Sequence, residues 1–254
     1  MSTLGGGEGA AFIADALAAQ GVDKIFGVVG IPVIEVGIAF QSAGLKYYGC
    51  RNEQAASYAA GAVGYLTQRP GVCLVVSGPG VIHALAGLAN AKENCWPMLL
   101  LGGANDSLQD GMMAFQEEDQ LRAVRQYCKF AARPPTIDQF PFFLDRAIRI
   151  AVSGRPGPVY LDLPGDMVNS APSAAAEDAQ LPSFYPTPVS MADPRELERA
   201  VQLLKGACVR AGSLVGWLVR LCVWTLTHHT FDWLAGWLAG RAAAAARKGA
   251  WPHK

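Results

Sequence analysis

The first half of the chain contains the run Val72-Cys73-Leu74-Val75-Val76-Ser77-Gly78-Pro79-Gly80. Its first five residues are apolar without alternation, which is typical of a strand buried on both faces of a parallel sheet. The Gly-Pro-Gly turn that follows suits a strand passing into a helix, because proline is favoured in the first helical turn. We therefore expect a strand over 72–77 and a helix over 81–92.

The same pattern of strand, turn and helix recurs on both sides of this run. Apolar segments predict further strands at 24–29, 45–50, 98–101 and 159–164. Helical spacing of apolar residues predicts helices at 8–20, 32–40, 53–68 and 137–152. The more polar stretch 105–135 is expected to hold one helix after Glu118. This alternation predicts an α/β domain with a doubly wound, mainly parallel sheet and helices on both faces.

Composition narrows the class of protein. The chain has 254 residues, of which 51% are apolar and 17% charged, as in a globular protein. Its net charge of zero gives no reason to expect nucleic acid as a partner. The six cysteines are widely spaced and contain no C-x-x-C pair, so neither a zinc site nor a disulfide framework is indicated. Residues 1–10 lack the features of a secretory signal, and we expect an intracellular protein.

The composition changes toward the C-terminus. We expect one domain over 1–169, a linker rich in Ala, Ser and Pro over 170–193, and a helix over 194–207 that begins a further domain. Residues 208–254 hold six basic residues against one acid and five of the six tryptophans. Their apolar stretch is interrupted by Arg220 and is short for a membrane span. We favour the interpretation that this tail comes from an alternative exon or an unspliced reading frame. A helix that contacts a membrane interface is the less favoured alternative.

Glu53 follows the expected strand 45–50 in the run Arg51-Asn52-Glu53-Gln54-Ala55-Ala56. A structural role accounts for it by itself, since Asn52 is a good N-cap and an acid in the first turn interacts favourably with the helix dipole. However, two Gly-Pro turns, Gly30-Ile31-Pro32 and Gly78-Pro79-Gly80, also follow expected strands. Ligands bind at the carboxyl ends of strands in doubly wound sheets. Glu53 is therefore a candidate for proton transfer to a ligand.

Three further side chains are weaker candidates. His83 lies one turn into a helix rich in alanine and leucine, where a packed, hydrogen-bonded histidine is the more common case. Phe115 and Gln116 could equally be packing residues of a loop. The glycines around Gly78 do not complete a dinucleotide or Walker fingerprint, so the phosphate-binding signal is weak.

Four motifs together carry a family resemblance: Gly27–Pro32, Arg51–Ala56, Ser77–Gly80 and Gly154–Val159. The set resembles the pyrimidine-binding domain of thiamine diphosphate enzymes. Within that superfamily, Arg69–Gly80, Ile82–Leu85 and Asn94–Pro97 are similar to the 2-hydroxyacyl-CoA lyases. The resemblance covers about residues 8–207.

The resemblance implies thiamine diphosphate as cofactor and gives Glu53 a defined role. Its carboxyl group would hydrogen-bond the pyrimidine N1′ and favour the imino tautomer that activates the cofactor. A raised carboxyl pKa would suit that role. The other implied cofactor-binding residues are Gly30, Ile31, Pro32, Pro79 and His83, with Phe115 and Gln116 facing the reacting centre across a subunit boundary.

The implied activity is cleavage of a 2-hydroxyacyl-CoA into formyl-CoA and a shortened aldehyde, a lyase step of fatty acid alpha-oxidation in the peroxisome. Activity like that of oxalyl-CoA decarboxylase or acetolactate synthase is the enzymatic alternative. The implied partners are an acyl-CoA substrate and a second copy or a full-length subunit, paired through the pyrimidine-binding domain.

The resemblance stops after residue 207. The Gly-Asp-Gly motif and the asparagine that hold Mg2+ and the diphosphate in the family do not occur in this sequence, so we expect no metal ligands here. We expect the chain to be inactive alone, or to act as a non-catalytic binding partner of the full-length enzyme. Because Pro252-His253-Lys254 is not a tripeptide of the Ser-Lys-Leu kind, a cytoplasmic location is also open.

Overall fold

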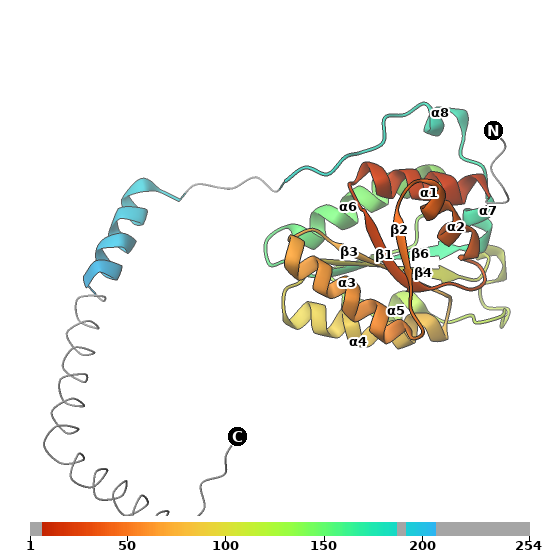
Figure 1. Cartoon of the computed structure of the whole chain (residues 1–254), viewed down its shortest axis with the longest axis horizontal. Coiled ribbons are helices and arrows are strands. Elements are labelled where there is room, and N and C mark those ends of the chain that lie inside the picture. Colours follow the sequence, from red (N-terminus) through yellow and green to blue (C-terminus); the bar gives the residue numbers. More distant parts are fainter. Residues whose placement is uncertain (1–6, 187–191, 207–254) are drawn as a thin grey trace, which may run out of the picture. The chain divides into compact units, whose positions relative to one another are not determined.

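A computed structural model describes residues 7–186 and 192–206 (Figure 1). The chain divides into two units, Met1–Pro188 and Val189–Lys254. In the second unit, residues 194–206 are helical, as expected, and their side chains are exposed. In the described residues, no helix is both long enough and apolar enough to cross a bilayer. The tail 208–254 and its possible membrane contact lie outside the described residues.

The first unit contains one six-stranded parallel sheet with the strand order β2-β1-β3-β4-β6-β5. The strands are β1 (Lys24–Val28), β2 (Lys46–Gly49), β3 (Gly71–Val75), β4 (Met98–Ala104), β5 (Phe130–Ala132) and β6 (Pro158–Pro164). The helices are α1 (Glu8–Ala19), α2 (Ile34–Ser42), α3 (Glu53–Thr67), α4 (Pro79–Glu93), α5 (Gln120–Arg125), α6 (Phe140–Val152), α7 (Gly165–Asn169) and α8 (Ala174–Glu177). The expected α/β class is confirmed.

The strand β3 lies inside the sheet and every one of its residues is buried. It pairs with β1 on one side and with β4 on the other, for example Val72 with Leu99. Its side chains alternate between the two faces, with Val72 and Leu74 in one apolar cluster and Cys73 and Val75 in the other. This explains why the sequence here is apolar without alternation.

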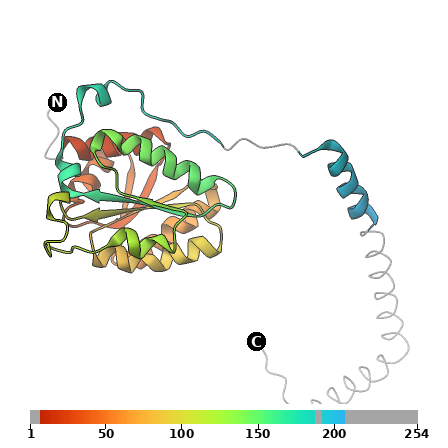
Figure 2. The same cartoon turned by 180° about the vertical axis from the view of Figure 1, so that it is seen from behind.

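The two apolar clusters correspond to two helical layers. In Figures 1 and 2, α1, α2 and α6 cover one face of the sheet, and α3, α4 and α5 cover the other. Aliphatic and aromatic side chains such as Leu17 and Phe140 fill the first interface. Smaller residues such as Ala60 and Ala84 fill the second, so α3 and α4 approach each other and the sheet closely.

Several details differ from the sequence-based expectations, and the short helices α7 and α8 were not expected either. The strand β5 was missed, because it has three residues inside a polar stretch. The strand β4 continues through Gly102 and Gly103, where glycine is needed because a Cβ would lie 2.4 Å from Tyr160 Oη and 2.9 Å from Pro32 Cδ, respectively. Pro32 lies ahead of α2 and not in its first turn, since Val33 is the N-cap.

Candidate functional site

The residues predicted to form the site gather at the carboxyl edge of the sheet. Gly30, Ile31 and Pro32 follow β1, Glu53 follows β2, and Pro79 follows β3. Phe115 and Gln116 belong to the segment between β4 and α5. Because all the strands are parallel, these segments emerge on the same side of the molecule.

Glu53 is the first residue of α3, and the capping role belongs to its neighbour. Asn52 is extended, with φ −153° and ψ 133°, and its Oδ1 accepts a hydrogen bond of 3.2 Å from Ala55 N. The Glu53 side chain is 15% exposed and its Oε2 lies 3.1 Å from His83 Nδ1. Since Asn52 caps the helix, the Glu53 carboxylate is left to interact with the imidazole and with a ligand.

His83 reaches Glu53 because α3 and α4 pack side by side. It lies in the second turn of α4 and its side chain is mainly exposed, so it is not the packed core histidine that was the alternative. The structure therefore brings together two residues that lie 30 positions apart and that were predicted from separate motifs.

The Gly30-Ile31-Pro32 turn lies against the ends of β3 and β4. A Cβ on Gly30 would lie 2.7 Å from Val76 Cγ1, so glycine lets the turn after β1 lie close to Val76, the residue after β3. Pro32 packs on the Gly103 backbone. The side chain of Ile31 is 67% exposed and is therefore free to contact a ligand.

Gln116 contacts the turn that begins α4. Gly78 has φ 58°, and a Cβ there would lie 2.5 Å from Gln116 O, so only glycine fits. Ser77 Oγ donates a hydrogen bond of 3.2 Å to Gln116 Oε1. Phe115 is 73% exposed, and Pro79 is the first residue of α4. Within the described residues, Phe115 and Gln116 make no hydrogen bond to Glu53.

The carboxyl edge thus carries the Glu53 carboxyl group, the His83 imidazole and several exposed apolar side chains, among them Val29, Ile31, Ile82 and Phe115. A carboxyl group of this kind can share a proton with a basic ring nitrogen, and exposed apolar side chains can contact the face of a flat ring. Across the described residues, no three His, Cys, Asp or Glu side chains are grouped so that they could hold a metal ion.

Buried ionisable groups beneath this edge stay neutral. Burial, with smaller contributions from Cys73 and Cys50, raises the pKa of Tyr47 to about 12. Burial likewise raises the pKa of Cys73 far above its ordinary value, with Cys50 and Glu53 adding to the shift. Both groups therefore keep their protons near neutral pH.

Sequence reasoning missed a polar cluster beside the site, formed by Gln120, Arg133, Tyr160 and Asp162. Asp162 is fully buried in β6 and accepts from Arg133 Nε at 2.8 Å. Burial opposes the charge of Arg133, but pairing with Asp162 and Asp110 raises its pKa above the usual value. The available signal was an acid inside the apolar strand Val159–Leu163, because such an acid needs a buried partner.

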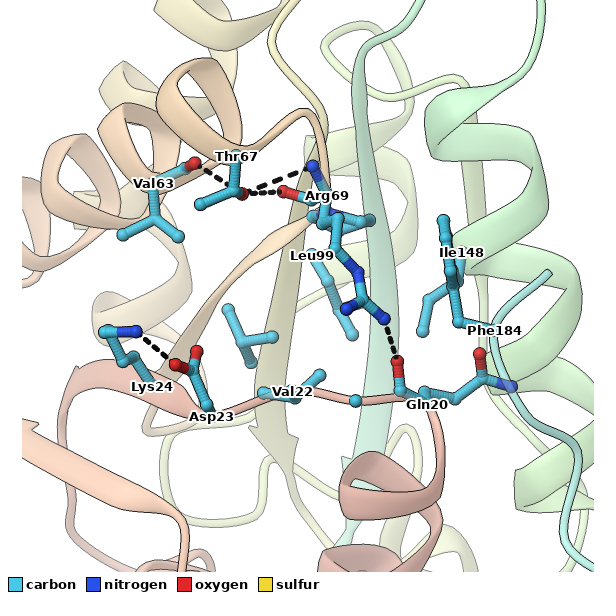
Figure 3. A pocket seen from close by; sticks show the side chains of 13 residues that line it. Gln20, Val22, Asp23, Lys24, Val63, Thr67, Arg69, Leu99, Ile148 and Phe184 are labelled. Carbon is cyan, nitrogen blue, oxygen red and sulfur yellow. Dashed lines mark hydrogen bonds and ion pairs between the residues drawn. The ribbon is translucent and has the colours of Figure 1, made fainter. Parts of the chain in front are cut away.

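A separate cavity of about 250 Å³ opens at the opposite, amino-terminal edge of the sheet (Figure 3). Arg69 crosses it to donate a hydrogen bond of 3.0 Å to Gln20 O, and its guanidinium lies 4.3 Å from the centre of the Phe184 ring. None of the residues predicted for the site lines this cavity. It instead shows how the segment around Phe184 is held to the domain.

Comparison with known proteins adds independent findings. Residues 7–123 match the family model described as thiamine pyrophosphate enzyme, N-terminal TPP binding domain. The chain is 52% identical over 199 residues to 2-hydroxyacyl-CoA lyase 1 of Mus musculus and 51% identical over 199 residues to that of Homo sapiens. It is 40% identical over 208 residues to oxalyl-CoA decarboxylase of Escherichia coli strain K12. These matches cover 78–79% of this chain but 34–36% of each relative, so the chain spans about a third of their length.

Proposed function

Residues 7–123 form the N-terminal TPP binding domain of a thiamine pyrophosphate enzyme, and from this premise we propose that the chain supplies the pyrimidine-binding part of a 2-hydroxyacyl-CoA lyase. The proposed reaction cleaves a 2-hydroxyacyl-CoA into formyl-CoA and an aldehyde that is one carbon shorter. The observation that carries the proposal is the largely buried Glu53 carboxyl group at the carboxyl edge, beside His83 and exposed apolar side chains.

Glu53 is the residue proposed to handle the proton. His83 contacts Oε2, and no hydrogen bond among the described residues engages Oε1, so Oε1 is available to a ring nitrogen of the cofactor. The partial burial of the side chain strengthens a hydrogen bond made there, because water competes less for the same oxygen. The proposed role of Glu53 is thus to hold and return one proton at Oε1.

The residues around Glu53 are proposed to bind the cofactor ring and to shield the carboxyl group from water. Ile31 and Phe115 expose apolar surface that would cover a flat ring and exclude water from the carboxyl group. The Gly30 and Gly78 turns keep backbone, and not side chains, at the base of the site. Thiamine diphosphate, when bound, would supply the carbanion chemistry of carbon-carbon cleavage. Magnesium and the diphosphate would be held by the family's diphosphate-binding domain, whose Gly-Asp-Gly motif does not occur in this sequence.

The choice of a 2-hydroxyacyl-CoA over an oxalyl-CoA substrate rests on similarity. The lyases of Mus musculus and Homo sapiens are 51–52% identical to this chain, whereas the oxalyl-CoA decarboxylase of Escherichia coli is 40% identical. Peroxisomal location and participation in fatty acid alpha-oxidation are proposed on the same similarity.

We also propose that α3 and α4 pair with a second subunit. Their outer surface carries Tyr58, Tyr65, Leu66 and Ile82, which are all exposed. Between Glu53 and the end of α3 there is no charged side chain. Exposed apolar surface without charge is characteristic of protein interfaces, so a second copy or a full-length subunit is the proposed partner.

The test is a chimera in which residues 1–206 replace the matching N-terminal third of the human 2-hydroxyacyl-CoA lyase 1. The chimera should release formyl-CoA from a 2-hydroxyacyl-CoA when thiamine diphosphate and magnesium are supplied. Glu53→Gln should lower kcat about 100-fold or more, because an amide cannot exchange the proton. The matched control is Glu8→Gln, since Glu8 is also the first residue of a helix but lies on α1.

The outcomes separate the alternatives. A folded chimera that cleaves oxalyl-CoA in preference to 2-hydroxyacyl-CoA would replace the lyase assignment by a decarboxylase. Equal activity of the Glu53→Gln and Glu8→Gln chimeras would remove Glu53 from the proton transfer. A folded chimera that binds full-length subunits but has no activity would favour the non-catalytic binding partner.

A further inference from the structure

Gln120, the first residue of α5, connects three segments that end at the carboxyl edge. Its side chain is buried, and its Oε1 accepts a hydrogen bond from Gly78 N, in the turn after β3. Its Nε2 lies 2.9 Å from Gly103 O in β4, and 3.0 Å from Tyr160 Oη and 2.8 Å from Asp162 Oδ1 in β6. One amide group therefore joins the starting turn of α4 to the ends of two neighbouring strands.

At neutral pH a primary amide meets both demands at this place, since it can accept a hydrogen bond and donate one. The backbone N–H of Gly78 can only donate and the carbonyl of Gly103 can only accept, so the orientation of the Gln120 amide is determined by its neighbours. Leucine would remove the acceptor of the buried Gly78 N–H and the side-chain donor to the Gly103 carbonyl. A glutamate carboxylate would satisfy Gly78 but would place a second negative charge beside Asp162.

Charged groups behind Gln120 extend the cluster to the loop after β4. Asp162 Oδ2 accepts from Arg133 Nε at 2.8 Å, and Arg133 Nη1 donates to Asp110 Oδ2 at 2.6 Å. Asp110 Oδ1 in turn accepts from Asn105 Nδ2 at 2.9 Å. The buried negative charge of Asp162 is therefore neutralised, and both ends of the loop 105–119 are attached to β6 through one connected set of hydrogen bonds.

The Gly78 turn connects this hydrogen-bonded cluster to the residues around Glu53. Gly78 is the N-cap of α4 and has a positive φ, so the direction in which α4 starts depends on the position of the Gly78 peptide. His83, which contacts Glu53, lies in the second turn of α4. On the other side of the turn, Ser77 Oγ holds Gln116.

We propose that Gln120 is a positioning residue of the cofactor site. Its side chain is hydrogen-bonded to β4 and β6 and accepts the hydrogen bond of the Gly78 N–H. Through Gly78 it determines where His83 and Gln116 lie relative to Glu53. The claim that this geometry serves cofactor activation rests on the proposed function. The placement itself does not, so it can be tested without cofactor or substrate.

The experiment measures amide hydrogen exchange and ring signals by NMR in the chain as it exists. The variants are Gln120→Leu, Gln120→Glu and, as matched control, Gln126→Leu, because Gln126 ends the same helix with an exposed side chain. The Leu74 amide, inside β3, reports global stability. Gln120→Leu should lower the protection of the Gly78 amide about tenfold or more relative to Leu74, and should shift the His83 ring signals. The control should do neither.

Gln120→Glu supplies a pH profile that loss of packing alone would not produce. At high pH its carboxylate is repelled by Asp162 and is displaced from the Gly78 N–H, so Gly78 protection should be low. Burial and the charge of Asp162 raise the pKa of the introduced carboxyl group above its ordinary value. As the pH falls below that raised pKa, the protonated group can donate to Asp162 and still accept from Gly78, so protection should return. If Gln120→Leu does not fold, the pH dependence of Gly78 protection in Gln120→Glu tests the proposal by itself.

Three results would overturn the proposal: Gly78 protection that falls only in step with Leu74, His83 signals that do not move, or a Gln120→Glu profile without recovery at low pH. None of these readouts involves cofactor or acyl-CoA. A failed lyase assay in the chimera would therefore remove the proposed function and leave the placement by Gln120 intact.

Discussion

The contact between α3 and α4 makes the fold sensitive to substitution of Gly87. A Cβ at position 87 would lie 2.1 Å from Ser57 Oγ, 2.4 Å from Ser57 Cβ and 2.8 Å from the Ser57 carbonyl carbon. Ser57 is fully buried and its hydroxyl group donates to Gln54 O at 2.8 Å. Gly87→Ala therefore pushes a methyl group against the side chain and the backbone of Ser57 in α3.

The magnitude follows from these distances. Carbon atoms in contact lie about 3.5–4.0 Å apart, so the two helices must separate by about 1 Å. Overpacking of this kind costs about 1–3 kcal/mol, and a clash with backbone belongs at the upper end. Alanine recovers about 1 kcal/mol, because glycine is the weaker helix former. The free energy of unfolding should fall by about 2 kcal/mol.

Gly61→Ala provides the matched control on the partner helix. Gly61 is also a buried helical glycine, but a Cβ there would meet only Trp96 Cε3, at an ordinary 3.6 Å. That variant should be unchanged or more stable by up to about 1 kcal/mol. Urea unfolding of both variants measures the difference in their free energies of unfolding, and equal stabilities would refute the reasoning.

Because Glu53 and His83 lie on these two helices, Gly87→Ala should also weaken their contact. NMR would detect this as a shift of the His83 ring signals.

Two further predictions concern the buried ionisable groups. Tyr47 and Cys73 are neutral in the folded chain, with the pKa of Tyr47 raised from 10.0 to about 12 and that of Cys73 raised above 9.0. Above pH 9 only the unfolded chain loses these protons, so stability is fully present below pH 9 and falls as the pH rises toward 12. In denaturation followed against pH, Tyr47→Phe should flatten the part of this fall above pH 10.0, and an unchanged slope would count against burial of Tyr47 as its cause. Arg133→Met leaves the fully buried Asp162 without its cation and should cost about 3 kcal/mol or more, whereas Arg125→Met, at the exposed end of α5, should stay within about 0.5 kcal/mol. Similar stabilities of Arg133→Met and Arg125→Met would show that the ion pair of Arg133 with Asp162 does not stabilise the fold.

The parts of the fold that were predictable are those that local patterns encode. An unbroken apolar run such as 72–76 predicts a buried parallel strand, and Asn52 predicts the start of α3 to the residue. The strand β5 was not predictable, because its three residues become a strand only by pairing with β6. The expected strand 98–101 stopped before Gly102 and Gly103, because the residues that lie against these glycines, Tyr160, Pro32 and Ser77, are far away in sequence.

The candidate site divides along the same line. Gly30, Glu53 and Pro79 follow strands, so their arrival at one edge follows from a parallel sheet. The contact of Glu53 with His83 depends on how closely α3 and α4 pack, and the distance between the two helices could not be predicted from local sequence patterns. Gln120 could not be found from its own neighbourhood, because its hydrogen-bond partners come from three other segments. Whether Glu53 exchanges a proton with a cofactor stays a prediction.

The two outermost strands limit how copies of this domain can associate. β2 has four residues and begins with Lys46, and β5 has three. Outer strands expose unpaired N–H and C=O groups, which can recruit strands of another chain into fibrillar aggregates, and shortness and lysine both oppose this. Lateral extension of the sheet from copy to copy is therefore disfavoured at both margins, which lowers the risk of amyloid-like growth during expression at high concentration.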